Sequence, residues 1–158
     1  MPNEHALRQQ LVKLLTSSEA HADYDKAVTK LAYDLQGKTP EGAEHSPWEL
    51  LEHLRITLWD ILEFSRDPKH QSPEWPSGYW PEDPAPKSDK DWDGSVQAFH
   101  HYLKELCAMV MDESKDLFAK IPHGDGQTLL REALLAADHT SYHVGQLVLV
   151  RRLLGAWQ

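Results

Sequence analysis

The chain has 158 residues, of which 41% are hydrophobic and 26% charged, and this ordinary globular composition excludes a largely disordered protein. The length is that of one domain, so we expect residues 1–158 to share a single core. The net charge is −9, with 16 basic against 25 acidic residues and no basic run, which argues against nucleic acid as a partner.

Cysteine content and the N-terminus limit the location of the protein and the chemistry of any metal site. Cys107 is the only cysteine, so neither an intramolecular disulfide nor a thiolate metal cluster is expected, and metal ligands should be nitrogen or oxygen atoms. The N-terminus lacks a basic start followed by an apolar run, and no stretch of about eighteen apolar residues predicts a membrane span. We therefore expect a cytoplasmic protein that does not enter a membrane.

The first forty residues predict two helical pieces. Leucines at helical spacing indicate a helix over residues 4–15, and the polar side chains of residues 16–18 break it. Asp23 or Asp25 is expected to cap a second piece, whose apolar residues run to Leu35 and which Gly37 and Pro40 end. Two separate helices and one kinked helix are both compatible with this pattern.

The clearest helix start in the sequence lies at Ser46. Ser46 is expected to be the N-cap, Pro47 occupies the first turn, and Glu49 is placed to complete a capping box. The helix should extend over residues 47–65. Its apolar residues occupy more than one side, which is typical of a helix largely surrounded by protein. His53 lies on this helix.

Residues 67–93 contain six prolines interleaved with aromatic residues, and such prolines preclude a regular helix. A loop of this length is usually functional or disordered. The aromatic content favours a segment packed over the protein as the lid or wall of a pocket, with Trp75, Tyr79 and Trp80 lining it. A linker whose tryptophans only cover the edge of the core is an equally weighted alternative.

Two further helices are predicted in the second half of the chain. Apolar residues from Trp92 to Val110 step by four and three, and after a turn-rich connection a long helix should run from about Gln127 to Leu154. No strand pattern competes with these helices. The predicted fold class is therefore all-α, a four-helix bundle that is most simply antiparallel, with the long Pro/Trp-rich loop between its second and third main helices.

The residues most suited to chemistry are three histidines. His139 and His143 are four residues apart on the last helix, so their side chains share one face about 6 Å apart along the axis, on an otherwise apolar stripe. One metal ion can bridge them, and His53 can add a third nitrogen ligand that leaves positions open for water and substrate. The alternative is a pair of partly exposed or hydrogen-bonded histidines without a metal.

Other polar residues are candidates for supporting roles. Glu132, two turns before His139, is expected either to orient a ligand imidazole or act as a base, or else to form a salt bridge inside the bundle. His21 is expected to be a helix cap or a second donor near the site, His123 to lie at the pocket mouth, and His45 to be structural. The remaining histidines are treated as surface residues: His5, His70, His100 and His101.

Two sequence segments resemble the DinB-like four-helix proteins, a family that includes YfiT-like hydrolases and bacillithiol or mycothiol transferases. These are residues 48–54, Trp-Glu-Leu-Leu-Glu-His-Leu, and residues 137–146, Ala-Asp-His-Thr-Ser-Tyr-His-Val-Gly-Gln. In that family the histidine of the second helix and two histidines of the fourth bind one divalent ion, usually nickel or zinc. The resemblance implies that His53, His139 and His143 take these roles. Residues 67–93 are not part of the general family pattern.

The resemblance leaves the reaction open, because members of the family carry out different chemistry. We expect a metal-dependent hydrolase or a low-molecular-weight thiol S-transferase, in which the metal lowers the pKa of a water or thiol and polarises the electrophile. The alternative is a non-catalytic metal-stabilised bundle or small-molecule binding module. A small-molecule substrate or thiol is the expected partner, and the family's tendency to dimerise makes a homodimer a further expectation.

Overall fold

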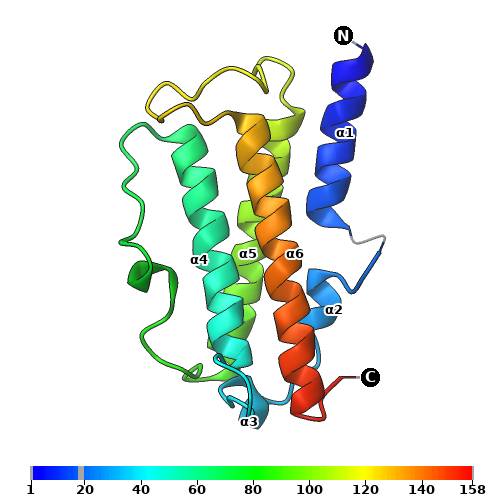
Figure 1. Cartoon of the computed structure of the whole chain (residues 1–158), viewed down its shortest axis with the longest axis vertical. Helices are drawn as coiled ribbons and strands as arrows, with labels where there is room; N and C mark the ends of the chain where they lie inside the picture. Colours follow the sequence, from blue (N-terminus) through cyan, green and yellow to red (C-terminus); the bar gives the residue numbers. More distant parts are fainter. Residues whose placement is uncertain (1, 18–19, 158) are drawn as a thin grey trace.

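Long α-helices standing side by side dominate the computed structural model, which describes residues 2–17 and 20–157 (Figure 1). The four long helices are α1 (Pro2–Thr16), α4 (Pro47–Arg66), α5 (Asp89–Met111) and α6 (Leu129–Leu153). The short helix α2 (Tyr24–Val28) lies below the end of α1 and beside α6, and the short helix α3 (Tyr33–Gln36) lies at the end of the bundle near the start of α4. The 3-10 turn η1 (Ser77–Tyr79) lies in the connection between α4 and α5. The described residues form no strand, which confirms the all-α bundle class.

The direction of α5 differs from the simplest prediction. Ser95 of α5 hydrogen-bonds to Glu52 of α4, and Arg66 at the end of α4 pairs with Glu105 further along α5, so the two helices run parallel. An all-antiparallel bundle is therefore wrong for this pair. The physical reason is the long connection of residues 67–88, here called the crossover loop, which returns along the whole length of α4 (Figure 1).

The two ends of the crossover loop are fixed beside the two ends of α4. At the start of the loop, the backbone N–H of Asp67 donates to the carbonyl of Glu63 at 2.8 Å. At its far end, the Ser46 hydroxyl donates to the carbonyl of Pro84 at 2.7 Å, and a Cβ added to Gly37 would collide with Ala85. Because α4 has 20 residues and is about 30 Å long, the loop must pass the middle of this helix on its way.

The capping signals predicted from the sequence are confirmed at α4. The Ser46 side chain accepts from the backbone N–H of Glu49 at 3.2 Å, and the Glu49 carboxylate accepts from the backbone N–H of Ser46 at 2.8 Å. Pro47 occupies the first turn, and the helix ends at Arg66, one residue beyond the predicted bound. Thr128 caps α6 in the same way, through the backbone N–H of Arg131.

We expect Ser46→Ala to lower the free energy of unfolding by about 1–2 kcal/mol, because it removes both the N-cap acceptor and the hydroxyl that donates to the carbonyl of Pro84. Ser88 is a matched control, since it occupies the N-cap position of α5 but makes no side-chain capping bond. Ser88→Ala should change the stability by less than about 0.5 kcal/mol. Chemical denaturation measures both changes, and equal midpoints for the two variants would contradict this role of Ser46.

The N-terminal region is more broken than predicted. Helix α1 ends at Thr16; residue 18, part of the predicted break, lies outside the described residues. Asp23 caps α2 through the backbone N–H of Lys26, but the helix stops at Val28, and Lys30 adopts a positive φ of 56°. A continuous second piece to Leu35 is therefore wrong. The carbonyls exposed by the break are bonded by the buried Arg151 guanidinium of α6, which donates to Ala27 and Thr29.

Polar side chains are buried on the α4 and α6 helices within an otherwise apolar core. The core is built mainly from leucines and other aliphatic residues of the four long helices. On α4 the buried polar residues include His53, Thr57 and Asp60, and on α6 they include Glu132 and His143. Burial of unpaired polar groups is costly, so partners for these side chains must be sought within the protein or in a ligand. No helix in the described ranges combines the length and the apolar character that a membrane crossing needs.

Candidate metal centre

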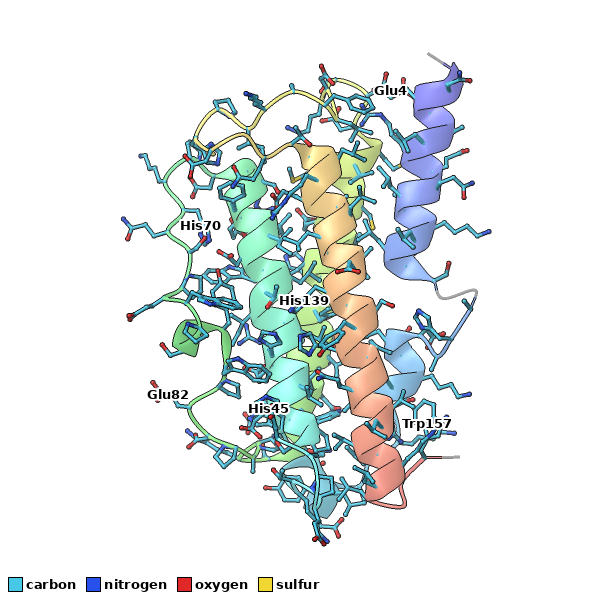
Figure 2. The ribbon with its side chains drawn as sticks, viewed as in Figure 1. Glu4, His45, His70, Glu82, His139 and Trp157 are labelled. Carbon is cyan, nitrogen blue, oxygen red and sulfur yellow. The ribbon has the colours of Figure 1, made fainter. Side chains whose placement is uncertain are left out.

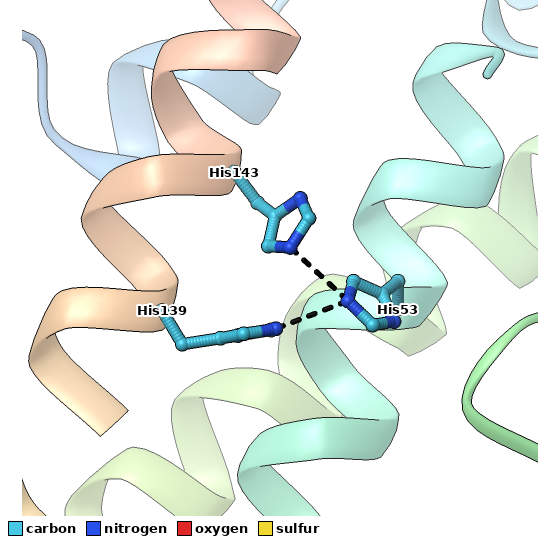
Figure 3. Close-up of side chains that lie close together, drawn as sticks. All are labelled: His53, His139 and His143. Carbon is cyan, nitrogen blue, oxygen red and sulfur yellow. Dashed lines mark hydrogen bonds between the residues drawn. The ribbon is translucent and has the colours of Figure 1, made fainter. Parts of the chain in front are cut away.

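The α4 and α6 helices bring three imidazole rings to one point, as the sequence predicts (Figure 3). The Nε2 atom of His53 lies 3.1 Å from Nε2 of His143 and 3.0 Å from Nε2 of His139. One ligand nitrogen from each ring falls within 4.8 Å of the others. His53 and His143 are buried and His139 is half-buried, so this group of nitrogen atoms is largely withdrawn from solvent.

The crossover loop contacts the His53 ring through residues 79–80. The Trp80 indole stacks on the His53 imidazole, with ring centroids 4.0 Å apart and an interplanar angle of 2°. The same indole stacks on His45 at 3.9 Å. The main-chain carbonyl of Tyr79 accepts a hydrogen bond from Nδ1 of His53 at 2.8 Å. The loop therefore restrains both the plane of the His53 ring and its rotation.

Hydrogen bonds at the Nδ1 atoms decide which nitrogen of each ring carries the proton. The carbonyl of Tyr79 can only accept, so Nδ1 of His53 must be protonated. Nδ1 of His143 lies 2.6 Å from the Oε1 atom of Gln146, which is likewise only an acceptor. In their neutral forms, both rings therefore present an unprotonated Nε2 to each other across 3.1 Å. Of the three rings only His139, whose Nε2 lies 3.0 Å from Nε2 of His53, can donate to this pair, and it serves one acceptor of the two.

The three rings are in the neutral form that binds metals. Burial, followed by repulsion from His143 and His53, lowers the pKa of His139 to about 3. Burial also lowers the pKa of His143 to about 4, with repulsion from His53 as the next cause. The pKa of His53 is lowered by burial too, although its bond to Tyr79 acts in the opposite direction. At neutral pH no imidazolium is present to fill the gap between the Nε2 atoms.

The distances fit a single ion. Two nitrogens at about 2.0–2.1 Å from a common metal, with roughly a right angle between the two bonds, lie about 3 Å apart. The 3.0 and 3.1 Å separations between Nε2 atoms match this arrangement. Three imidazole nitrogens without a carboxylate suit zinc, nickel, copper or iron rather than the oxygen-seeking calcium and magnesium. The residues present therefore fit a divalent transition-metal ion.

The three aromatic residues predicted to line a pocket take different positions. Trp80 covers His53, as described above. Tyr79 turns its hydroxyl to Asp60 on α4 at 2.7 Å; burial and the Asp60 carboxylate raise the pKa of Tyr79 to about 12, so the phenol keeps its proton. Trp75 is 75% exposed and touches the edge of the Tyr79 ring. The loop thus packs against α4 near the histidines through residues 79–80, while Trp75 projects outward.

The other candidates for supporting roles lie away from the three histidines. His21 contacts Ser141, on the face of α6 opposite to His139, and lines a cavity of about 750 Å³ between α1, α2, α5 and α6 that includes none of the three histidines. His123 donates to the carbonyl of Phe64, which is about 16 Å along α4 from His53. The structure therefore places neither residue at the histidine cluster.

Glu132 is buried on the same face of α6 as His139 but about 10 Å along the helix axis from it. Its carboxylate pairs with Arg131 at 2.7 Å, which corresponds to the salt-bridge alternative from the sequence. Burial raises its pKa, and the charge of Asp60 acts in the same direction. Glu132 is thus paired with Arg131 at some distance along α6 from the imidazoles.

Sequence reasoning missed several residues around the cluster. His70 was expected at the surface, but its side chain is only 8% exposed and its Nε2 donates to Asp60 at 2.7 Å; that expectation is wrong. The roles of Gln146 and of the Tyr79 carbonyl were not foreseen. Gln146 follows His143 by three residues, a spacing that signals contact on a helix, whereas a main-chain carbonyl leaves no signal in the sequence. His5, His100 and His101 are exposed, as expected.

The fold and the cluster define a class of protein, a four-helix bundle with three histidines contributed by α4 and α6. The family model of the DinB superfamily matches residues 10–147, which take in the second half of α1, all of α4 and α5, and most of α6. The chain belongs to the DinB superfamily. Comparison with curated proteins and with solved structures gave no match.

Proposed function

We propose that the protein binds one divalent transition-metal ion through the Nε2 atoms of His53, His139 and His143. The observation that carries this proposal is the pair of unprotonated Nε2 atoms of His53 and His143, which face each other in a buried position at 3.1 Å. Without an electrophile, the only donor that the three neutral rings can offer to this pair is the Nε2–H of His139, which bonds to Nε2 of His53 and leaves Nε2 of His143 unsatisfied. A metal ion satisfies both and uses the third nitrogen as well.

Metal analysis tests this function directly. Protein dialysed against Zn²⁺ or Ni²⁺ and then passed through a desalting column should retain about one ion per chain. A variant that changes two exposed histidines, His5→Ala combined with His101→Ala, should retain the same amount, because these side chains lie outside the cluster. Retention that disappears in this control variant, or a wild type that retains no ion, would overturn the proposal.

We further propose that the ion is a catalytic centre, of either a hydrolase or a low-molecular-weight thiol S-transferase. Such an ion supplies Lewis acidity, which three neutral imidazoles do not diminish, and three protein ligands leave room for an exogenous group. A buried hydroxyl supports this: Thr57 follows His53 by one turn of α4, and its Oγ1 has no hydrogen-bond partner among the described residues. A ligand hydrogen-bonding with this hydroxyl would be held one helical turn from the ion.

In this proposal the protein's own side chains position the reactants. Tyr79 and Gln146 keep the protons on Nδ1 of His53 and His143, so that Nε2 remains a ligand atom in both rings. Trp80 excludes water from the ring face of His53. Assays for ester hydrolysis and for thiol transfer to an activated electrophile, each with and without added metal, decide between the two reactions.

The second candidate is a metal-stabilised bundle without catalytic activity. Its support is that Trp80 covers His53 and that the cavity of about 750 Å³ lies on the other side of α6, away from the three histidines. In that case the ion serves to hold α4 and α6 together. Metal-dependent turnover in either assay would rule this candidate out, whereas metal binding with no turnover favours it.

A further inference from the structure

Asp60 holds two residues of the crossover loop with one carboxylate. It is buried on α4, two turns after His53 and on the same side of the helix. Its Oδ1 accepts from Nε2 of His70 at 2.7 Å, and its Oδ2 accepts from the Tyr79 hydroxyl at 2.7 Å. Trp59 adds an edge contact to the His70 ring. Figure 2 labels His70, which lies on the loop beside α4.

Tyr79, which Asp60 anchors, also hydrogen-bonds to His53. Tyr79 donates from its side chain to Asp60 and accepts at its main-chain carbonyl from Nδ1 of His53 at 2.8 Å. The next residue, Trp80, provides the indole that stacks on the His53 ring. Tyr79 therefore contacts α4 at two positions, Asp60 and His53, and the position of its carbonyl depends on where its phenol is anchored.

Hydrogen bonds to a buried carboxylate are among the stronger polar contacts in proteins, since one partner is ionised. The exposed residues between the two anchored ones, such as Trp75 at 75% exposure, contribute little packing of their own. Residues 70–80 therefore depend on Asp60 to stay in place against α4. Without that anchor, the ordering of this segment would have to accompany metal binding and would weaken the apparent affinity.

We propose that Asp60 is a positioning residue for the metal centre, which acts by anchoring His70 and Tyr79 so that the crossover loop fixes the His53 ring in its ligand orientation. The inference rests on the proposed metal binding and extends it to a residue that touches none of the three histidines. It assigns the crossover loop a function in metal retention. Partners of a ligand histidine of this kind typically contribute 10–100-fold to metal affinity.

The test compares Zn²⁺ affinity and Zn²⁺ release to a fluorescent chelator in Asp60→Asn, Tyr79→Phe and the double variant. Each single variant should bind Zn²⁺ about 10–100-fold more weakly and release it faster. Because both changes break the same contact, the double variant should be only slightly worse than the Asp60 variant alone. Glu63→Gln is the matched control, because Glu63 is a carboxylate on the same helix whose ion pair is with Arg66. The Zn²⁺ affinity of this variant should stay within about twofold of wild type.

The outcomes separate this inference from the proposed function. If the wild type binds Zn²⁺ tightly and both single variants bind it equally tightly, Asp60 does not position His53 and the inference is overturned while metal binding stands. If the effects of the two changes simply add, the coupling through Tyr79 is overturned. If the wild type binds no Zn²⁺, both proposals fail together. Should Asp60→Asn not fold, Tyr79→Phe decides alone, since it removes one oxygen atom and retains the ring.

Discussion

His139→Ala is expected to abolish stoichiometric metal binding. His139 contributes one of three imidazole nitrogens, and the remaining pair would be a two-nitrogen site. The loss in affinity should exceed about a hundredfold, because loss of an outer partner of a ligand histidine alone costs 10–100-fold. His139 is the best of the three to change, since it is half-buried and its truncation leaves the smallest hole in the core. Competition with a chelator of known affinity measures the effect.

A surface histidine provides the control for this variant. His100 is 44% exposed in its side chain and pairs with Asp25, on the other side of the bundle from the cluster. His100→Ala should bind one ion with the affinity of wild type. If His139→Ala still carries one tightly bound ion per chain, the ligand set proposed here is wrong, whatever the metal.

Removing the metal is expected to lower the melting temperature substantially. An ion that joins α4 to α6 binds only the folded chain, so at a free concentration about 1,000-fold above its Kd it stabilises the protein by about 4 kcal/mol. For a protein of this size, each kcal/mol corresponds to roughly 2–4 °C, so a chelator should lower the melting temperature by roughly 8–16 °C. Scanning calorimetry of the protein with and without chelator measures this shift.

The same chelator should leave the melting temperature of His139→Ala unchanged, because that variant has no tightly bound ion to lose. Equal melting temperatures for metal-loaded and metal-free wild type would show that the cluster does not couple metal binding to folding. A drop of similar size in the wild type and in the variant would mean that the chelator acts elsewhere on the protein.

Features set by neighbouring residues in the sequence were predicted well. The Ser46 cap, the helix that follows it and the spacing of His139 and His143 all depend on contacts within a few residues, and the structure confirms them. The interruption at residues 29–32 was missed because it is stabilised from a distance, by the Arg151 side chain of α6. Capping residues and apolar spacing near α2 carry no signal of a donor on α6.

The direction of α5 was predicted wrongly, although the sequence carries a signal for it. A connection of 22 residues between α4 and α5 is far longer than an antiparallel neighbour needs, and it suffices to return along a helix of about 30 Å. The aromatic residues of this loop were interpreted as marking a lid or pocket wall, and its prolines only as precluding a helix, although a long non-helical connection also allows the chain to return along α4. The parallel arrangement brings residues 79–80 to the middle of α4, where His53 lies.

The direction of the His53 side chain could not be predicted from the apolar spacing of α4. The place of this residue off the main leucine stripe of α4 gave no direction for its side chain, and the resemblance to the DinB-like proteins supplied the expectation that it meets His139 and His143. The structure explains the placement: α5 covers one side of α4, while α6 and the crossover loop cover others, so a second buried face exists. His70 was misjudged for the same reason, because only the folded loop brings it to Asp60.

Anomalous diffraction from crystals of the metal-loaded protein tests the central proposal most directly. Data collected on either side of the absorption edge of the bound metal should show one strong peak per chain, about 2.0–2.1 Å from the Nε2 atoms of His53, His139 and His143. A strong peak bound by other residues, or loaded crystals with no peak between α4 and α6, would contradict it.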